Sequence, residues 1–242
     1  SPGVRVATAN LLHGVSPSDG RCDLTRLRAA VAAVDADALA LQEVDVRQPR
    51  SGLVDQAAEA AAAAGAADWR FVPVLGDGAG AGGGYGIALL LRVPVREWRV
   101  LPLGRARLPA PIWLPVERRF VPALDEPRVA VAALLDGMSV VATHLSFVPG
   151  ANVRQLRRLT GWAAQLPGPV LLLGDLNLPG ALPQLIAGPG WRALGRLPTY
   201  PTLRPRVQFD HVLAHGPLPA VCAVASIPLP VSDHRALVVT LQ

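Results

Sequence analysis

Short apolar runs, separated by glycine, proline or polar turns, recur along the chain and predict a protein rich in β-strands. Strands are expected at residues 4–12, 36–44, 70–75, 87–92, 127–135, 139–145, 170–173, 208–214, 221–227 and 236–241. The runs at 127–135 and 139–145 flank an Asp-Gly pair at 136–137, which is a strong β-hairpin signal. The proline-broken stretch 93–125 predicts another hairpin and irregular connections.

Apolar residues at helical spacing predict fewer helices than strands. Asp23 precedes one such pattern as its N-cap, and Gly65 closes a second, alanine-rich pattern. A third helix is expected at 151–166 and a short one near 180–187. Because several strands are apolar on both faces, two packed β-sheets with helices outside would bury them. No linker appears, so we expect residues 1–242 to form one α/β domain.

Composition and charge restrict the class of protein only modestly. Apolar residues make up 51% of the chain and aromatic residues 5%, which predicts an aliphatic core. No apolar run is long enough to span a bilayer, and the first residues do not resemble a secretion signal. We therefore expect a cytoplasmic monomer without membrane insertion, and a processed secreted form stays open. The net charge is +5, and all basic residues other than histidine are arginines, so a modest preference for anionic partners follows.

Two further features carry little functional signal. Cys22 and Cys222 lack metal-site spacing and are expected to be reduced, with one disulfide bridge as the alternative. The glycine-rich stretch 76–86 lacks the lysine and hydroxyl residues of a phosphate-binding P-loop. It is expected to be a flexible connection.

Polar side chains occur where apolar runs open into loops, and this regularity is the most informative one in the chain. The set comprises Asn10, Glu43, His144, Asp175, Asn177, Asp210, Asp233 and His234. Each residue alone is explained as a turn former, a cap or a structural residue. If the strands lie side by side, however, all of them converge on one rim of the sheets. Their oxygen atoms suit Mg²⁺ or Mn²⁺, and no cluster of cysteine and histidine indicates structural zinc.

The stretch LLLGDLN places Asp175 and Asn177 two residues apart, directly after a buried strand. Residues i and i+2 of an extended chain point to the same side, so this carboxylate and this amide are expected to face one site. Hydrolysis of an anionic phosphodiester needs a cation, a base near the attacking water and donors toward the phosphoryl oxygens. The set of polar residues contains groups for each of these tasks.

Five short motifs together resemble the endonuclease/exonuclease/phosphatase superfamily of metal-dependent phosphoesterases. They are LQEVD (41–45), THLS (143–146), GDLN (174–177), FDHVL (209–213) and SDH (232–234). Each motif alone is weak, but their order and spacing are specific, and the resemblance covers nearly the whole chain. It implies a four-layer α/β sandwich in which two mixed β-sheets are packed together and flanked by helices.

The resemblance also implies a metal site for Mg²⁺ or Mn²⁺ and a base. Glu43 would be the principal metal ligand, Asn10 would complete the shell around the ion, and Asp233 would be a secondary ligand. Asp175 would orient and deprotonate the attacking water, while Asn177 would hold that water or a phosphoryl oxygen.

Two histidines complete the roles that the resemblance implies. His234 would bond the scissile phosphate, and Asp210 would hold His234 in its tautomer by accepting an N–H bond. His144 would contact the phosphate or protonate the leaving group. By contrast, His211 alternates to the opposite face of its strand and is expected to be structural, and His13 has a loop context with no partner.

Substrate contacts are less well defined by the sequence. The resemblance implies that one of Arg118 and Arg119, which precede a strand where family members place a phosphate-contacting arginine, contacts phosphate, the alternative being a solvated charge on an edge strand. Tyr200, with Thr199 and Arg204, is expected either to line the substrate cleft or to shape its loop.

These observations predict a Mg²⁺- or Mn²⁺-dependent phosphoesterase that hydrolyses a phosphodiester by in-line attack of an activated water. A nuclease acting on nucleic acid is placed first because of the positive charge. A phosphatase, or a phosphodiesterase of phospholipids or small molecules, is the alternative within the family. A catalytically silent binding module is the alternative from another class, and the complete set of polar residues argues against it.

Overall fold

The computed structural model describes residues 3–76, 83–114 and 118–242, and its strands form two six-stranded sheets and a separate hairpin. The first sheet has the order β13 (Val221–Ile227), β14 (Ala236–Leu241), β1 (Val4–Asn10), β2 (Ala38–Val46), β4 (Gly84–Leu91), β3 (Asp68–Gly76). The second has the order β11 (Trp191–Ala193), β12 (Asp210–His215), β10 (Val170–Asp175), β9 (Ser139–His144), β8 (Arg128–Leu134), β5 (Glu97–Gly104). Each sheet is mixed, because β1 runs parallel to β2 and β9 parallel to β10, whereas the other pairs are antiparallel.

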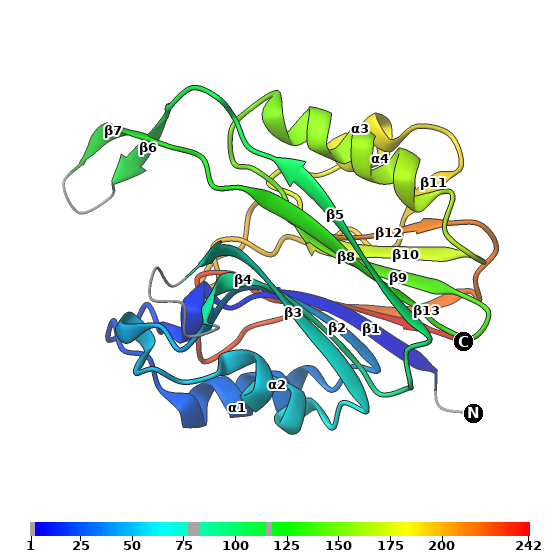
Figure 1. Cartoon of the computed structure of the whole chain (residues 1–242), viewed down its shortest axis with the longest axis horizontal. Coiled ribbons are helices and arrows are strands. Elements are labelled where there is room, and N and C mark those ends of the chain that lie inside the picture. Colours follow the sequence, from blue (N-terminus) through cyan, green and yellow to red (C-terminus); the bar gives the residue numbers. More distant parts are fainter. Residues whose placement is uncertain (1–2, 77–82, 115–117) are drawn as a thin grey trace.

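Helices cover the outer face of each sheet (Figure 1). They are α1 (Leu24–Val34) and α2 (Gln56–Ala64) on the first sheet, and α3 (Ala151–Ala163) and α4 (Leu182–Ala187) on the second. Three buried apolar clusters separate the layers, one between the sheets and one beneath each pair of helices. The predicted four-layer α/β sandwich is therefore confirmed.

The predicted cap of the first helix and the predicted end of the second are both confirmed. The side chain of Asp23 accepts a hydrogen bond from the backbone N–H of Arg26, which caps α1. Asp55 caps α2 in the same way, through the N–H of Ala58. Gly65 ends α2 with a φ of 65°, a left-handed conformation that favours glycine.

The stretch 93–125 contains the expected hairpin, formed by β6 (Ala110–Leu114) and β7 (Arg119–Ala123), in addition to β5. Figure 1 shows that this hairpin projects beyond the two sheets. The short strand β11 was not predicted. Part of the glycine-rich stretch, residues 77–82, lies outside the described residues, and both cysteines are free.

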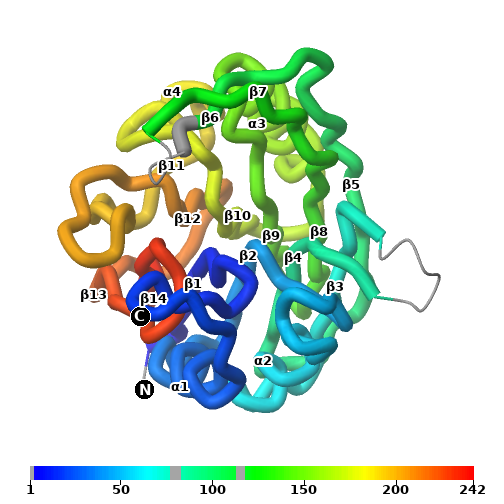
Figure 2. Tube along the Cα trace, turned by 90° about the vertical axis from the view of Figure 1, so that its left-hand side faces the viewer, coloured from blue at the N-terminus to red at the C-terminus, as the bar shows by residue number. Residues whose placement is uncertain are grey.

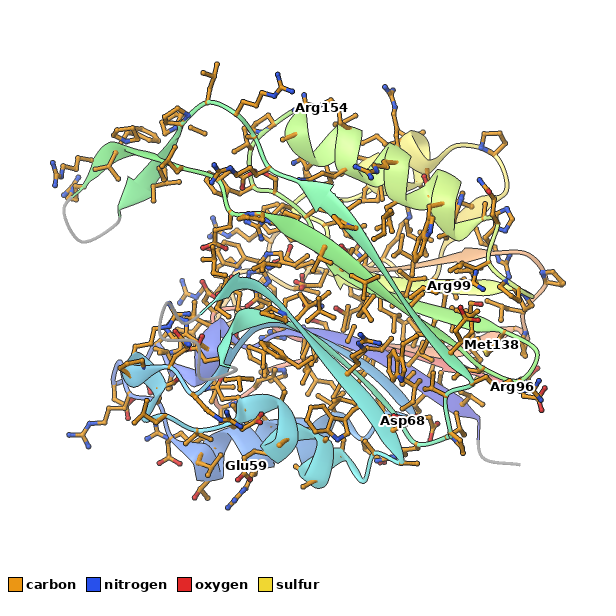
Figure 3. The ribbon with its side chains drawn as sticks, viewed as in Figure 1. Glu59, Asp68, Arg96, Arg99, Met138 and Arg154 are labelled. Carbon is orange, nitrogen blue, oxygen red and sulfur yellow. The ribbon has the colours of Figure 1, made fainter. Side chains whose placement is uncertain are left out.

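An apolar cavity lies between the sheets, at the end of the sandwich where β1 begins. It has a volume of about 520 Å³, and its walls include Val6, Ala38, Leu91 and Leu171. Figure 3 shows Arg96 and Met138, which also border this cavity, at the end of the molecule opposite the β6–β7 hairpin. Among the described residues, no helix is both long enough and apolar enough to cross a membrane.

Candidate active site

The register of three neighbouring strands brings three of the predicted residues together. Asp175, the last residue of β10, lies opposite His144 at the end of β9 and opposite Asp210 at the start of β12. Figure 2 looks onto this edge, where β1 and β2 of one sheet face β9, β10 and β12 of the other. The expected convergence of polar strand ends on one rim is therefore present.

Glu43 reaches this edge from within a strand. The pairing of β2 with β4 is interrupted between Leu41 and Val44, which marks a β-bulge, and Glu43 has a φ of 53°. Bulges re-aim side chains, and left-handed backbone at a residue other than glycine is concentrated at functional sites. The bulge therefore turns the Glu43 carboxylate toward the rim. In a regular strand, this side chain would follow the alternation between the two faces of the sheet.

Asn10 connects the two sheets across the site. Its Nδ2 donates hydrogen bonds to Oε1 of Glu43 and to Oδ2 of Asp175, both at 3.0 Å. Its Oδ1 accepts from the backbone N–H of Leu12, also at 3.0 Å. In this arrangement Asn10 presents its donor group to the carboxylates, so it fits the position of a residue that orients Glu43 better than that of a direct metal ligand.

Asn177 lies beside Asp175 for a different reason from the one expected. The extended chain ends at Asp175, and Asn177 has a φ of 50°, so the alternation of a strand does not apply. Instead, the backbone N–H of Asn177 donates to Oδ1 of Asp175 at 3.0 Å, closing a tight turn. The Asn177 amide donates to the Leu145 carbonyl at 2.8 Å and lies 3.5 Å from Nε2 of His144.

His234 and Asp210 form a hydrogen-bonded pair behind Asp175. Nδ1 of His234 lies 2.8 Å from Oδ2 of Asp210, and the same oxygen accepts from the hydroxyl of Thr199 at 2.6 Å. Nδ1 therefore carries a proton, and Nε2 is directed toward Oδ2 of Asp175 at 3.8 Å. Burial opposes a charged imidazole here, but the carboxylates of Asp210 and Asp175 outweigh it and raise the pKa of His234 to about 10.

Burial also shifts the other titratable groups of the site. It raises the pKa of Asp175 to about 7, with the Asp210 carboxylate acting in the same direction. It raises the pKa of Glu43, assisted by the nearby negative charge of Asp233. It lowers the pKa of His144 well below its usual value, and the positive charges of Arg128 and His234 add to this. At neutral pH His144 is therefore a neutral imidazole.

These side chains surround a pocket of about 400 Å³. Six of the predicted residues line it, namely Asn10, Glu43, His144, Asp175, Asn177 and His234. Asp210 lies behind His234 and is fully buried. Asp233 is not part of the lining, although its charge acts on Glu43. Tyr200 is not part of the lining either, and its ring packs on that of His234 with centroids 5.0 Å apart.

Arg118 and Arg119 lie elsewhere. Both are exposed residues of the β6–β7 hairpin and do not line the pocket. The wall instead contains Arg128, which is 6% exposed and has an Nε without a hydrogen-bond partner. Its guanidinium lies 3.5 Å from Asp125 and 3.9 Å from Glu126. Arg128 begins a strand that is otherwise apolar. This position at a strand end is the feature of the sequence that could have marked Arg128 as a site residue.

Three further lining residues were not assigned to the site from the sequence. His13 follows β1 in a short 3₁₀ turn, η1 (Leu12–Gly14), and it has a φ of 43°. Arg50 lies 5.0 Å from the centre of the Tyr85 ring, and both residues line the pocket. Arg50 also pairs with the buried Asp45 at 2.7 Å. His211, as expected, is structural, and its Nε2 lies 2.8 Å from the Leu178 carbonyl.

The chemistry of the donors around Glu43 fits a hard divalent cation. Among the described residues, Glu43 accepts a side-chain hydrogen bond only from Asn10, so its carboxylate keeps further acceptor capacity toward the pocket. Potential ligand atoms of Asp175, Asp210 and His234 also lie within 4.8 Å of one another. In that group, however, the short contact between His234 and Asp210 is a hydrogen bond, so the Glu43 carboxylate is better suited to a cation than this group is.

Comparisons with known proteins agree with this geometry. A sequence model of the endonuclease/exonuclease/phosphatase family matches residues 7–234. No curated protein matches the chain.

Solved structures with the same fold include an endonuclease/exonuclease/phosphatase from Beutenbergia cavernae, which is 26% identical with a TM-score of 0.73 and covers 100% of this chain and 72% of that one. The mannosyl-6-phosphatase of Bacteroides thetaiotaomicron is 15% identical, with a TM-score of 0.67 and coverage of 99% of both chains. TDP2 of D. rerio, complexed with single-strand DNA product, is 16% identical, with a TM-score of 0.65 and coverage of 100% of both chains.

Proposed function

The chain belongs to the endonuclease/exonuclease/phosphatase family, whose members are hydrolases of phosphoester bonds, and we propose that this protein hydrolyses a phosphodiester with the help of Mg²⁺ or Mn²⁺. The observation that carries the proposal is the position of Asp175. Its carboxylate contacts Asn10 and lies within 4 Å of both His144 and His234. A base is thus surrounded by groups that can orient water and stabilise a phosphate.

Each residue has a separate role in the proposed hydrolysis. Glu43 would hold the divalent cation, with Asn10 and Asp233 beside it, and such a cation supplies the positive charge that neutralises the phosphate. Asp175, with a pKa of about 7, accepts the proton of the attacking water at neutral pH. Asn177 holds that water or a phosphoryl oxygen through its amide.

The histidines act on the phosphate. His234 is protonated and donates its Nε2–H to a phosphoryl oxygen, while Asp210 fixes the ring through Nδ1. His144 is neutral, so a hydrogen bond to the phosphate suits it better than protonation of the leaving group. Arg128 adds a guanidinium to the wall of the pocket, where it can take the phosphate-contacting role that was predicted for Arg118 or Arg119.

A nucleic acid, which is a polyanionic phosphodiester, is the substrate that the charge of the protein favours. The net charge of +5 suits a nucleic-acid backbone, which carries many negative charges. The similarity in fold to TDP2 bound to single-strand DNA product supports the same choice. The similarity to a mannosyl-6-phosphatase supports monoester hydrolysis as the second candidate.

Hydrolysis of two small esters tests the proposal. Bis(p-nitrophenyl) phosphate and p-nitrophenyl phosphate are offered with Mg²⁺, Mn²⁺ or EDTA to the wild type, to Asp175→Asn and to Asp136→Asn. Asp136 is a matched control, because its carboxylate is 86% exposed and pairs with Arg96 at the other end of the molecule. We expect metal-dependent cleavage of the diester that falls at least about 100-fold in Asp175→Asn and is unchanged in the control. Faster cleavage of the monoester would favour the phosphatase, and full activity of Asp175→Asn would contradict the mechanism.

Binding of the metal is tested separately from catalysis. Isothermal titration with Mn²⁺ should show one site in the wild type and its loss in Glu43→Gln. Glu97→Gln is the control, since Glu97 lies on the surface and pairs with Arg99. Mn²⁺ binding without any ester cleavage would favour the silent binding module, whereas equal binding by Glu43→Gln would place the ion elsewhere.

A further inference from the structure

An arginine-lined cavity lies next to the catalytic pocket and takes no part in the chemistry described above. It has a volume of about 200 Å³ and is lined by Leu103, Arg105, Ala151, Arg154, Gln155 and Arg158. Arg154 and Arg158 project from successive turns of α3, and Arg105 follows the last residue of β5. Figure 3 shows Arg154 at the end of α3 that lies toward the β6–β7 hairpin.

The positive charge of this cavity is not compensated by the protein. Among the described residues, no carboxylate pairs with Arg105, Arg154 or Arg158. Carboxylates do pair with Arg26, Arg28, Arg50, Arg92, Arg96, Arg99 and Arg128. Arg154 and Arg158 are four residues apart on one helix, where like charges repel, and Arg154 lies in the first turn, near the positive end of the helix dipole. An anion in the cavity would relieve both repulsions.

Hydrogen bonds fix this cavity relative to the catalytic pocket. Gln155, which is buried at its base, donates to the Gly104 carbonyl at 3.1 Å and accepts from the Ser146 N–H at 2.8 Å. The segment that follows β9 is thereby tied both to α3 and to the end of β5. At the start of α3, Asn152 donates to the carbonyl of Asn177 at 3.1 Å. A ligand held by the three arginines therefore has a defined position relative to the reacting groups.

The two pockets are close enough to contact one strand of nucleic acid. Phe147 lines the catalytic pocket and Ala151 lines the arginine cavity, so four residues of chain separate them. Four residues span at most about 14 Å. A nucleic-acid strand carries a charge about every 3.4 Å along a duplex axis, so phosphates a few nucleotides apart would reach both pockets. Arginine is well suited to such contacts because its guanidinium can bind phosphate through two parallel hydrogen bonds.

We propose that Arg105, Arg154 and Arg158 form a subsite for a backbone phosphate of a nucleic-acid strand whose scissile phosphate lies in the catalytic pocket. The inference rests on the proposed function, since it identifies the substrate class of the same enzyme. A phospholipid with one phosphate, such as phosphatidylglycerol, would leave the second phosphate subsite without a ligand.

Binding measurements without turnover test this subsite. A fluorescein-labelled single-stranded DNA oligonucleotide is titrated in EDTA by fluorescence anisotropy, over a range of salt concentrations. The proteins are the wild type, the double variant Arg154→Gln/Arg158→Gln, and Arg157→Gln. Arg157 is the matched control, because it is an exposed arginine of the same helix that does not line the cavity. Hydrolysis of bis(p-nitrophenyl) phosphate, which is too small to reach the cavity, is measured in parallel.

The double variant should bind about 10-fold more weakly, and the slope of log K against log salt should fall by about 0.7, since the subsite holds one phosphate and a lost phosphate contact on a single strand contributes about 0.7. Arg157→Gln should bind as the wild type does, and all three proteins should cleave the small diester equally. Equal losses in Arg157→Gln and in the double variant would show only diffuse attraction and would overturn the subsite. The same holds if phosphatidylglycerol vesicles displace the oligonucleotide and bind with the same dependence on Arg154 and Arg158.

If the oligonucleotide binds as expected but the wild type cleaves no ester, the subsite stands and the proposed function fails.

Discussion

Replacing Asp210 by asparagine is expected to change the stability of the protein in a defined range of pH. Asp210 accepts the Nδ1 proton of His234, and the pKa of His234 is about 10 against an ordinary value of 6.5. A folded-state pKa above the unfolded one stabilises the folded protein. This stabilisation is fully present below pH 6.5 and is lost as the pH rises toward about 10. Because His234 is 7% exposed, solvent screens little of this effect.

The size of the change in the free energy of unfolding is worked out for the part of this pH range in which His234 titrates and Asp175 does not. Burial raises the pKa of Asp175 to about 7, so above about pH 7.5 its carboxylate is mostly ionised. The interval from about pH 7.5 to about pH 10 covers about 2.5 pH units, and each unit changes the free energy of unfolding by about 1.4 kcal/mol. The free energy of unfolding of the wild type should therefore fall by about 3 kcal/mol over this range.

In Asp210→Asn the main attraction for the imidazolium is gone, and burial opposes the charge. The pKa of His234 should fall, and the decrease in stability above pH 7.5 should disappear. The assay is urea unfolding in EDTA, followed by tryptophan fluorescence at several pH values between about 7.5 and 10. Asp136→Asn, which removes an exposed carboxylate, should keep the decrease seen in the wild type. An equal decrease in Asp210→Asn and in the wild type would refute the assignment of the proton to this pair.

Three further changes test other parts of the structure. Arg128→Gln should raise the KM for a phosphodiester about 10-fold, because a charged hydrogen bond to phosphate is lost; Arg96→Gln, at the far end, should leave steady-state kinetics unchanged. Gly174→Ala should lower the melting temperature by about 5 °C, since its methyl group would meet the Thr143 carbonyl and push β10 from β9; an unchanged melting temperature would contradict that contact. Ala38→Val should stabilise the protein to urea by about 1 kcal/mol, because it fills part of the apolar cavity between the sheets, and destabilisation would show that the cavity has no room for two methyl groups.

The strand ends of the candidate site could be predicted from the sequence because each polar residue interrupts an apolar run. Asn10, His144 and Asp175 are indeed the last residues of their strands. Their mutual position depends on register, and register is set by pairing between strands distant in the chain. The bulge that aims Glu43 has the same origin, since it is defined only against the partner strand β4.

Contacts between side chains from distant loops could not be predicted from the sequence. Thr199 was expected to line the cleft or to shape its loop; it is buried, and its hydroxyl donates to Asp210, a contact that the sequence did not predict. Arg128 was not singled out, because an arginine at the start of a strand has the same pattern whether it faces solvent or a pocket. Arg118 and Arg119 were favoured because they precede a strand in the region where the resembling family places a phosphate-contacting arginine, but their hairpin extends away from the sheets.

The two hydrogen bonds of Asn10 limit how far the two sheets can shift relative to each other before the active site loses its geometry. One amide nitrogen reaches a carboxylate of each sheet at 3.0 Å, and a donor and acceptor separated by about 3.6 Å no longer form a hydrogen bond. A relative slip of the two sheets by about half an ångström would therefore release Glu43 or Asp175. Substitutions in the apolar layer between the sheets, far from any reacting atom, should consequently alter turnover at temperatures where the protein is still fully folded.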